Sequence, residues 1–202
     1  PEVLGVTDLN GDGRDDLVAV TANQLSPSPR IVTVLLQQAG GSVGLVGDFR
    51  GSTGSVSDML LADVNRDGRP DVLLTWLADA GDSDQEGGLD VLLQQNDATL
   101  SAPFHYTVGR APSRLACGEL DGRPGLDLAV ACDLSNEITL LLNNGSGAFP
   151  TREHYLAFGG SDCVAVGDFD NDGWDDVAVL NHDDELGTAI RHNPMVSLLK
   201  GL

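Results

Sequence analysis

Short hydrophobic runs recur along the whole chain, and their length predicts β-strands. The first three runs are VLGVT at 3–7, LVAV at 17–20 and IVTVLL at 31–36. Runs of this kind are rich in Val, Leu and Ile and are bounded by Gly, Asp, Asn or Pro, whereas helices need longer periodic segments. The stretches QQAGG and NNGSG, each after the third run of its unit, are typical of turns. The chain is therefore predicted to be all-β.

One acidic stretch marks four repeats of this pattern. Each copy has a hydrophobic run before it, a second run directly after it and a third run further on, and three copies add a weaker fourth segment. The copies are DLNGDGRDDL at 8–17, DVNRDGRPDV at 63–72, ELDGRPGLDL at 119–128 and DFDNDGWDDV at 168–177. Such self-similarity indicates a repeat architecture. The units are expected to span 1–56, 57–111, 112–160 and 161–202, the last without its outer strand.

Each unit is expected to be a four-stranded antiparallel meander. Because the hydrophobic runs are nearly continuous, both faces of each sheet must be covered, as they are when sheets stack face to face around an axis in a β-propeller. A β-sandwich would give no reason for one acidic loop to recur at the same place in each unit. We therefore expect one propeller-type domain of about four blades, part of a larger propeller, with a closed four-bladed ring as the alternative.

The acidic stretch has the composition of a loop that holds a hard cation. Counted from its first residue, oxygen-bearing side chains fill positions 1, 3, 5 and 9 and glycine fills position 6 in the first, second and fourth copies. Alternate side chains on a curled loop converge, glycine permits the turn, and calcium takes about six to eight oxygen ligands. The predicted calcium ligands, with Arg14, Arg69 and Trp174 acting through backbone carbonyls, are Asp8, Asn10, Asp12, Arg14, Asp16, Asp63, Asn65, Asp67, Arg69, Asp71, Asp168, Asp170, Asp172, Trp174 and Asp176.

Neither an EF-hand nor an ordinary hairpin turn accounts for the acidic loop as well as a repeated cation site does. An EF-hand needs a glutamate at position 12, where this chain has Ala19, Leu74 or Val179 inside a predicted strand. A hairpin turn rich in Asp, Asn and Gly fits one copy, but not the same positions filled in three. Two unit charges about 4 Å apart repel by roughly 4 kcal/mol at an effective dielectric constant of 20, so converging carboxylates need a cation. About three calcium ions are therefore expected.

The third copy departs from the pattern, and no calcium is expected in the 119–127 loop. Position 1 is Glu119, position 5 is Arg123 and position 6 is Pro124. Proline cannot adopt the positive φ that glycine supplies, and arginine places a positive charge where a carboxylate should stand. We hypothesise that the Arg123 guanidinium takes the role of the cation by pairing with Glu119 or Asp127.

Charge and cysteine content exclude several classes of partner. The chain has 31 acidic and 11 basic residues, a net charge of −20, which repels nucleic acid and anionic membranes. No hydrophobic stretch approaches the roughly 18 residues of a spanning helix, so membrane insertion is not expected.

The first residues lack the basic and hydrophobic regions of a secretion signal, which favours a mature or excised segment. Cys117, Cys132 and Cys163 are expected to be buried thiols, with a Cys117–Cys132 bridge as the alternative.

The pattern D-x-[ND]-x-D-G-x-x-D before a hydrophobic strand, repeated at this spacing, resembles the FG-GAP/VCBS repeats of integrin α-subunits and many extracellular proteins. The resemblance covers nearly the whole chain and implies a propeller, usually seven-bladed, with calcium between the first two strands of a blade. It implies ligands in copies one, two and four. In a meander, the second connections lie at the opposite edge from the calcium loops, and here they vary most in length: 22–29, 79–88, 133–136 and 181–194. A protein or glycan ligand is expected there.

Signals for catalysis are weak, so no enzyme activity is expected. GGSVG at 40–44 matches a nucleophile motif but stands between two predicted strands, and His182 and His192 share one acidic loop. Trp76 and Trp174 are expected to pack rather than to form a glycan platform. The sequence thus predicts a calcium-stabilised extracellular propeller module for protein–protein or cell-surface interaction, since such calcium sites would be empty in the cytosol. The alternatives are a carbohydrate-binding propeller and a non-catalytic propeller attached to an extracellular hydrolase or lyase.

Overall fold

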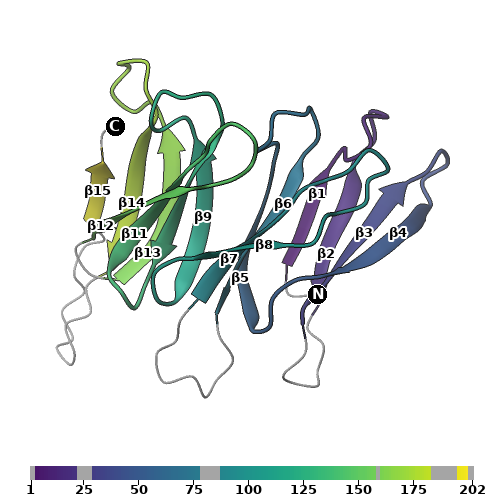
Figure 1. Ribbon diagram of the computed structural model, residues 1–202, viewed down its shortest axis with the longest axis horizontal. Helices are drawn as coiled ribbons and strands as arrows, with labels where there is room; N and C mark the ends of the chain where they lie inside the picture. Colours follow the sequence, from purple (N-terminus) through teal and green to yellow (C-terminus); the bar gives the residue numbers. More distant parts are fainter. Residues whose placement is uncertain (1–2, 22–28, 78–86, 158–159, 183–194, 200–202) are drawn as a thin grey trace.

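A computed structural model describes residues 3–21, 29–77, 87–157, 160–182 and 195–199 (Figure 1). The regular elements in these ranges are all β-strands, which confirms the predicted all-β class. None of the described residues forms a helix that is long and hydrophobic enough to cross a membrane.

The strands form four separate antiparallel sheets, each in simple chain order. The first sheet consists of β1 (Val3–Thr7), β2 (Asp16–Thr21), β3 (Ile31–Gln37) and β4 (Val43–Arg50). The second consists of β5 (Ser55–Ala62), β6 (Asp71–Leu77), β7 (Gly87–Leu92) and β8 (Phe104–Thr107). The third consists of β9 (Pro112–Gly118), β10 (Asp127–Cys132), β11 (Glu137–Leu142) and β12 (Thr151–Leu156). The fourth consists of β13 (Gly160–Gly167), β14 (Asp176–His182) and β15 (Met195–Leu199). We call them blades 1 to 4.

The blades stack face to face, and their cores lie between consecutive sheets. Alternate residues of a strand point to opposite faces, so Leu73 on β6 packs toward blade 3 while Val72 and Leu74 pack toward blade 1. The second strands β6 and β10 are buried along nearly their whole length because they have a neighbouring blade on both sides. This arrangement explains the nearly continuous hydrophobic runs and confirms the predicted meander blades.

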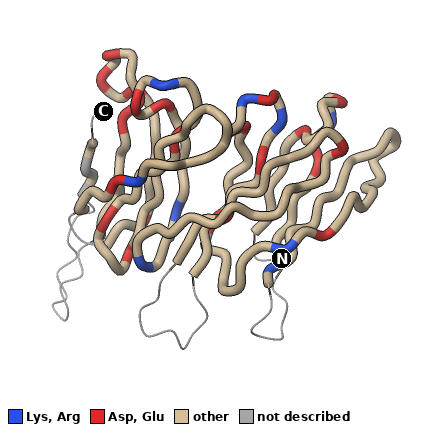
Figure 2. Tube along the Cα trace, viewed as in Figure 1, with Lys and Arg blue, Asp and Glu red and all other residues tan. Residues whose placement is uncertain are grey.

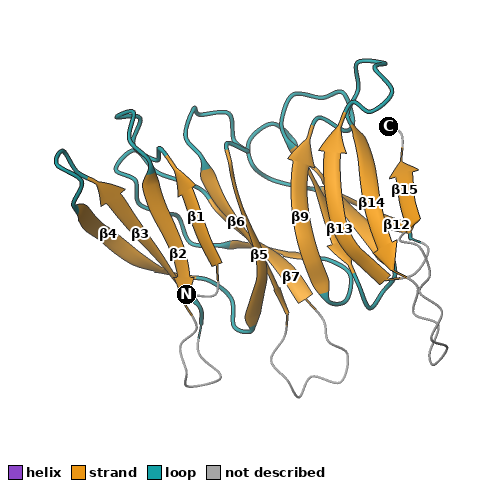
Figure 3. Ribbon diagram, turned by 180° about the vertical axis from the view of Figure 1, so that it is seen from behind, coloured by secondary structure: helices purple, strands orange, loops and turns teal. Residues whose placement is uncertain are grey.

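The row of blades is not closed into a ring. Seen from either side, the sheets follow one another from β4 at one end to β15 at the other (Figures 1 and 3). The alternative of a closed four-bladed ring is therefore wrong for this chain. The first connection of every blade and the third connections of blades 1 to 3 lie at one edge of the row, where many of the acidic residues gather (Figure 2).

The three cysteines are all free, so the alternative of a Cys117–Cys132 bridge is wrong. Cys132 is buried as expected, and burial raises the pKa of its thiol to about 12. Cys117 is half-buried, whereas Cys163 is exposed on blade 4, contrary to the expectation of a buried thiol.

Candidate metal centres

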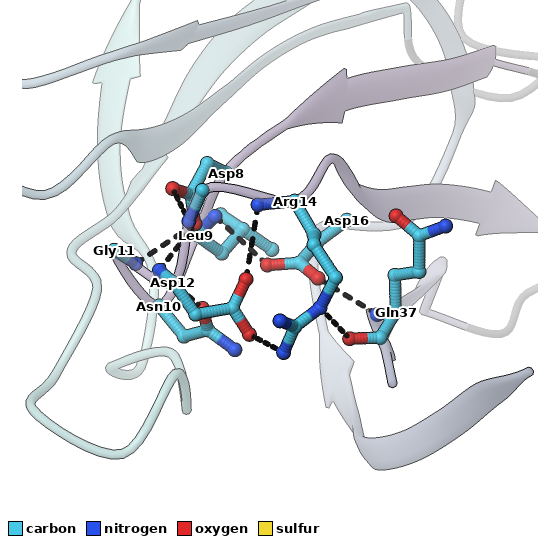
Figure 4. A network of polar contacts seen from close by, with 9 residues as sticks. Asp8, Leu9, Asn10, Gly11, Asp12, Arg14, Asp16 and Gln37 are labelled. Carbon is cyan, nitrogen blue, oxygen red and sulfur yellow. Dashed lines mark hydrogen bonds and ion pairs between the residues drawn. The ribbon is translucent and has the colours of Figure 1, made fainter. Parts of the chain in front are cut away.

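The first acidic loop wraps its backbone around the carboxylate of Asp8 (Figure 4). Asp8 Oδ2 accepts a hydrogen bond from the Gly13 N–H at 2.7 Å. Asp8 Oδ1 accepts from the N–H groups of Gly11 and Asp12 at 2.8 and 3.1 Å. Asn10 Oδ1 also accepts from the Asp12 N–H, at 3.0 Å. These backbone bonds, that from Gly13 above all, lower the pKa of Asp8 because they stabilise its charged form.

The same backbone bonds recur in the second and fourth loops. Asp63 accepts from the Gly68 N–H at 2.8 Å, and Asp168 accepts from the Gly173 N–H at 3.0 Å. The glycine at position 6 has a positive φ in all three loops, 81° at Gly13, 85° at Gly68 and 95° at Gly173, as the sequence predicts. Position 4 also has a positive φ in all four loops. The sequence does not indicate this, because different residue types occupy the position: Gly11, Arg66, Gly122 and Asn171.

The aspartate at position 9 ties three strands of its own blade together. Asp71 is buried, and its Oδ2 accepts from the Val64 N–H at 3.1 Å while its Oδ1 accepts from the Gln94 N–H beyond β7 at 2.8 Å. Asp16 and Asp127 each accept the two equivalent backbone bonds. Burial raises the pKa of Asp71 to about 6 because it disfavours the charged carboxylate, and the nearby negative charges of Asp67 and Asp63 raise that pKa further. Sequence reasoning assigned these residues a ligand role and missed the structural one.

Side-chain amides connect the loops of neighbouring blades. Gln94 Nε2 donates to the Leu9 carbonyl, across the interface between blades 1 and 2. Asn143 Nδ2 donates to the Val64 carbonyl at 2.8 Å, across the interface between blades 2 and 3. The N–H groups of Leu9 and Val64 are themselves bonded to the position-9 aspartates of their blades. A continuous chain of hydrogen bonds therefore joins the first three loops.

The first two loops carry their own cationic group. The guanidinium of Arg14 forms an ion pair with Asp12 Oδ2 (Figure 4), and that of Arg69 forms the same pair with Asp67. Both arginines stand at position 7 and both aspartates at position 5. Each pair thus neutralises part of the charge of a predicted ligand.

The fourth loop has no basic residue at this place. Its position-7 residue is Trp174, whose indole lies over Gly122 of the third loop, where an added Cβ would approach the ring to 2.6 Å. The neighbouring Asp175 accepts from the Glu119 N–H at 2.9 Å. The fourth loop is therefore packed against the third, and Trp174 packs there as expected, although 51% of its surface stays exposed.

Carboxylates gather most closely in the fourth loop. Among the described residues, one group of three acidic side chains places a carboxylate oxygen from each within 4.8 Å of the others: Asp168, Asp170 and Asp176. In the first two loops position 3 is an asparagine instead, Asn10 or Asn65. The donor set of all three loops consists of carboxylate and amide oxygens, which suits a hard divalent cation.

The third loop differs from the others at the places that the sequence indicates. The positive φ that the other loops have at position 6 lies here at position 7, in Gly125 at 135°, one residue after Pro124. Arg123 is largely exposed and lies 3.8 Å from Oδ2 of Asp121. The hypothesis that it pairs with Glu119 or Asp127 is therefore wrong. Asp127 accepts backbone N–H bonds with both its oxygens, so it needs no cationic side chain.

Restoring the consensus in the third loop is expected to create a metal site. The double change Arg123→Asp and Pro124→Gly supplies the missing carboxylate at position 5 and the residue that tolerates a positive φ at position 6. Titration calorimetry should then count one more calcium ion for each chain than in the parent protein. Arg123→Asp alone is the matched control, because it keeps the proline. An unchanged count in the double variant would contradict the account of this loop.

The candidate catalytic residues that the structure describes do not form a catalytic arrangement. GGSVG at 40–44 belongs to the β3–β4 turn, in which the Gln38 N–H donates to the Ser42 carbonyl. An unforeseen cluster brings Ser52, Asp90 and His105 together, but Ser52 Oγ and Asp90 Oδ1 both contact the same His105 nitrogen, Nδ1, at 3.1 and 2.7 Å. A catalytic triad uses both ring nitrogens. Asp90 also accepts from the indole of Trp76 at 3.0 Å, which supports a packing role for that tryptophan.

The opposite edge of the blades is described only in part. Of the four second connections, the 133–136 turn lies within the described residues, where the Asn136 N–H donates to the Asp133 carbonyl. Residues 22–28, 78–86 and 183–194 lie outside them, and with them His192 and most of the predicted ligand surface.

Comparison with known proteins gives a family match. A family model for an FG-GAP-like repeat matches residues 8–74 and 119–179. Each matched segment begins at one acidic stretch and ends in the strand after the next, and together they cover more than half of the chain. No curated protein matches the chain.

Proposed function

Because the chain belongs to the FG-GAP-like repeat family, we propose that it is a calcium-stabilised extracellular module of propeller-type blades that mediates protein–protein or cell-surface interaction. The observation that carries the proposal is the shared construction of the first, second and fourth loops. In each, the position-1 carboxylate accepts backbone N–H bonds from positions 5 and 6, and three further oxygen-bearing side chains stand in the same loop.

The residues of these loops fit calcium by the chemistry of their donors. Positions 1, 3, 5 and 9 would offer side-chain oxygens, and Arg14, Arg69 and Trp174 at position 7 would offer backbone carbonyls. An oxygen that accepts one N–H bond keeps a second lone pair for a cation. Bound calcium would supply positive charge that offsets repulsion between the carboxylates. Millimolar extracellular calcium suits sites of this class, which supports the proposed location.

The interaction surface is proposed for the edge opposite the calcium loops. Hydrogen bonds from their own backbone N–H groups hold the acidic loops together, so we assign these loops a role in stabilising the blades. The second connections are the variable ones, and variable loops on a rigid scaffold commonly bind partners. A protein or a glycan is the proposed ligand. The carbohydrate alternative gains no support from Trp76, whose indole N–H is already bonded to the buried Asp90.

The proposal predicts that arginine competes with calcium in the second loop. Arg69→Gln removes the guanidinium that pairs with Asp67, so Oδ2 of that carboxylate loses its charged partner and keeps only the Asn65 amide. Because an exposed ion pair contributes up to about 1 kcal/mol, we expect calcium affinity at one site to rise by about threefold. Titration calorimetry at low ionic strength would measure the change.

Arg66→Gln is the matched control for this experiment. Arg66 stands in the same loop and carries the same charge, but it makes no ion pair with a described residue. Its removal should change calcium affinity less than that of Arg69. Equal effects would show that only net charge matters, and absence of calcium binding in the parent protein would overturn the proposed function itself.

A further inference from the structure

Within the row, every blade uses one sheet face to contact the preceding blade and the other face to contact the following blade. In blade 3, Leu128 and Val130 pack toward blade 2, whereas Ala129 and Ala131 pack toward blade 4. The first and third residues after the position-9 aspartate thus face the preceding blade, and the second and fourth face the following one. Each blade has one face for its predecessor and one for its successor.

Blade 1 exposes the face that would meet a predecessor. We call it the leading face. Its hydrophobic side chains are more than half exposed to solvent: Leu4 58%, Val6 56%, Val43 52% and Leu45 63%. They come from β1 and β4, the two edge strands of this sheet, and β2 and β3 lie between these strands. A hydrophobic sheet face of this kind is unusual on a protein surface and indicates a contact.

Blade 4 exposes the face that would meet a successor. We call it the trailing face. Leu180, Val196 and Leu198 are exposed on it, and they lie side by side because Ala178 pairs with Leu198 and Leu180 pairs with Val196. An open hydrophobic hollow of about 190 Å³ lies over this sheet, with Cys163, Val164, Ala165, Ala178, Val179, Leu180 and Val196 around it.

The second residue of each acidic loop gives independent support. Its side chain is buried under the following blade in the first three loops, at 1% exposure for Leu9, 0% for Val64 and 1% for Leu120. The equivalent residue of the fourth loop is Phe169, which is 50% exposed. A large aromatic side chain therefore stands at the trailing face, where three counterparts are covered.

A side-chain amide at the leading face gives a third indication. Gln94 and Asn143 each donate to the carbonyl of the second loop residue in the preceding blade. Gln37 occupies the same place in blade 1, since its N–H donates to Asp16 as theirs do to Asp71 and Asp127. Its side-chain amide has no hydrogen-bond partner among the described residues.

We propose that the trailing face of one copy of this chain docks on the leading face of a second copy, head to tail. The Gln37 amide of one copy then donates to the Phe169 carbonyl of the other, and the exposed hydrophobic side chains of the two faces cover each other. The second copy is the occupant because each face offers what the other lacks. The hydrophobic stacking is that of the three interfaces within the chain, and the amide bond is that of two of them. The inference does not depend on bound calcium.

A head-to-tail contact has recognisable consequences. It is heterologous, so it leads either to a closed ring of copies or to an open chain of them. Two copies of net charge −20 repel each other, so association should strengthen with added salt, and also with calcium if the loops bind it. Sedimentation velocity of the full chain at increasing concentration and moderate ionic strength should show species of at least twice the monomer mass.

Two single changes test the direction of the contact. Leu45→Lys places a charge on the leading face and Leu198→Lys places one on the trailing face, and each alone should weaken self-association by about tenfold or more. An equimolar mixture of the two should recover association, because each variant keeps the face that the other has lost. Leu156→Lys is the control: Leu156 is 86% exposed on β12 of blade 3, away from both end faces, and its change should have no effect.

Thermal melts of all variants confirm that each is folded before masses are compared. Gln37→Ala removes only the amide and should weaken association less than the lysine variants do. A parent protein that stays monomeric at every concentration would overturn the proposal and leave the end faces to other partners. Association that survives both lysine variants, or a mixture that fails to associate, would show that the contact is not head to tail.

Discussion

Replacing Asp127 by alanine is expected to lower the free energy of unfolding by about 3 kcal/mol or more, with or without calcium. Asp127 is fully buried and accepts the N–H groups of Leu120 at 2.9 Å and Asn143 at 2.7 Å. Alanine would leave both buried N–H groups without acceptors, and hydrogen bonds to a charged group contribute roughly 1.5–3 kcal/mol each. Burial raises the pKa of Asp127, so part of the loss is offset by relief of its desolvation.

Chemical denaturation measured in calcium and in chelator would separate the two roles of this position. Asp121→Ala is the control in the same loop, because Asp121 accepts one local N–H and pairs only loosely with Arg123; it should cost less than about 1 kcal/mol. If the loss at Asp127 appeared only in calcium, the third loop would be a metal site. If no loss appeared, position 9 would not be a structural tie.

Removal of calcium is expected to cause the largest change in stability. A ligand that binds only the folded state contributes about 2.7 kcal/mol at a free concentration 100 times its dissociation constant. Three independent sites would therefore contribute about 8 kcal/mol, which for a chain of this size corresponds to a midpoint lower by about 15 °C or more in chelator. Thermal melts followed by circular dichroism would measure it.

A variant with one weakened metal site measures how much of the calcium-dependent stabilisation a single loop contributes. Asp168→Asn weakens the predicted position-1 ligand of the fourth loop. The remaining amide oxygen can still accept one of the two N–H bonds that Asp168 accepts from Asp172 and Gly173. It should lose about a third of the calcium-dependent stabilisation. Identical melts of the parent protein in calcium and in chelator would mean that the loops are polar turns and nothing more.

The blades could be predicted from sequence because their signals are local. The second strands read as continuous hydrophobic runs since they are covered on both faces, and the acidic loop fixes where each run begins. Gly13, Gly68 and Gly173 could be assigned to a tight turn for the same reason, because their positive φ follows from their place in a nine-residue motif.

Contacts between distant segments could not be predicted in the same way. The Gln94 amide meets the Leu9 carbonyl across 85 residues of sequence, and neither residue type suggests a bond. The grouping of Ser52, Asp90 and His105 is equally hidden, because it needs the third and fourth strands of blade 2 beside the linker from blade 1. The partner of Arg123 could not be predicted either, because one of the backbone N–H groups that satisfy Asp127 comes from Asn143, beyond the next strand.

The aspartate at position 9 is both a predicted metal ligand and a structural link between strands of its blade. The same aspartate recurs in the first, second and fourth loops, which have all the predicted ligand residues, and in the third loop, which lacks two of the consensus residues. Metal binding alone would not require it there, whereas the tie between the first and third strands does. A motif defined by its metal can therefore persist where the metal is not expected.

Calorimetric titration of the full chain with calcium tests the central claim most directly, because it counts the sites. The account predicts about three ions for each chain, in the loops at 8–16, 63–71 and 168–176. Absence of binding heat, confirmed by equilibrium dialysis, would contradict the calcium-stabilised module. A fourth ion of similar affinity would contradict the distinction drawn between the third loop and the others.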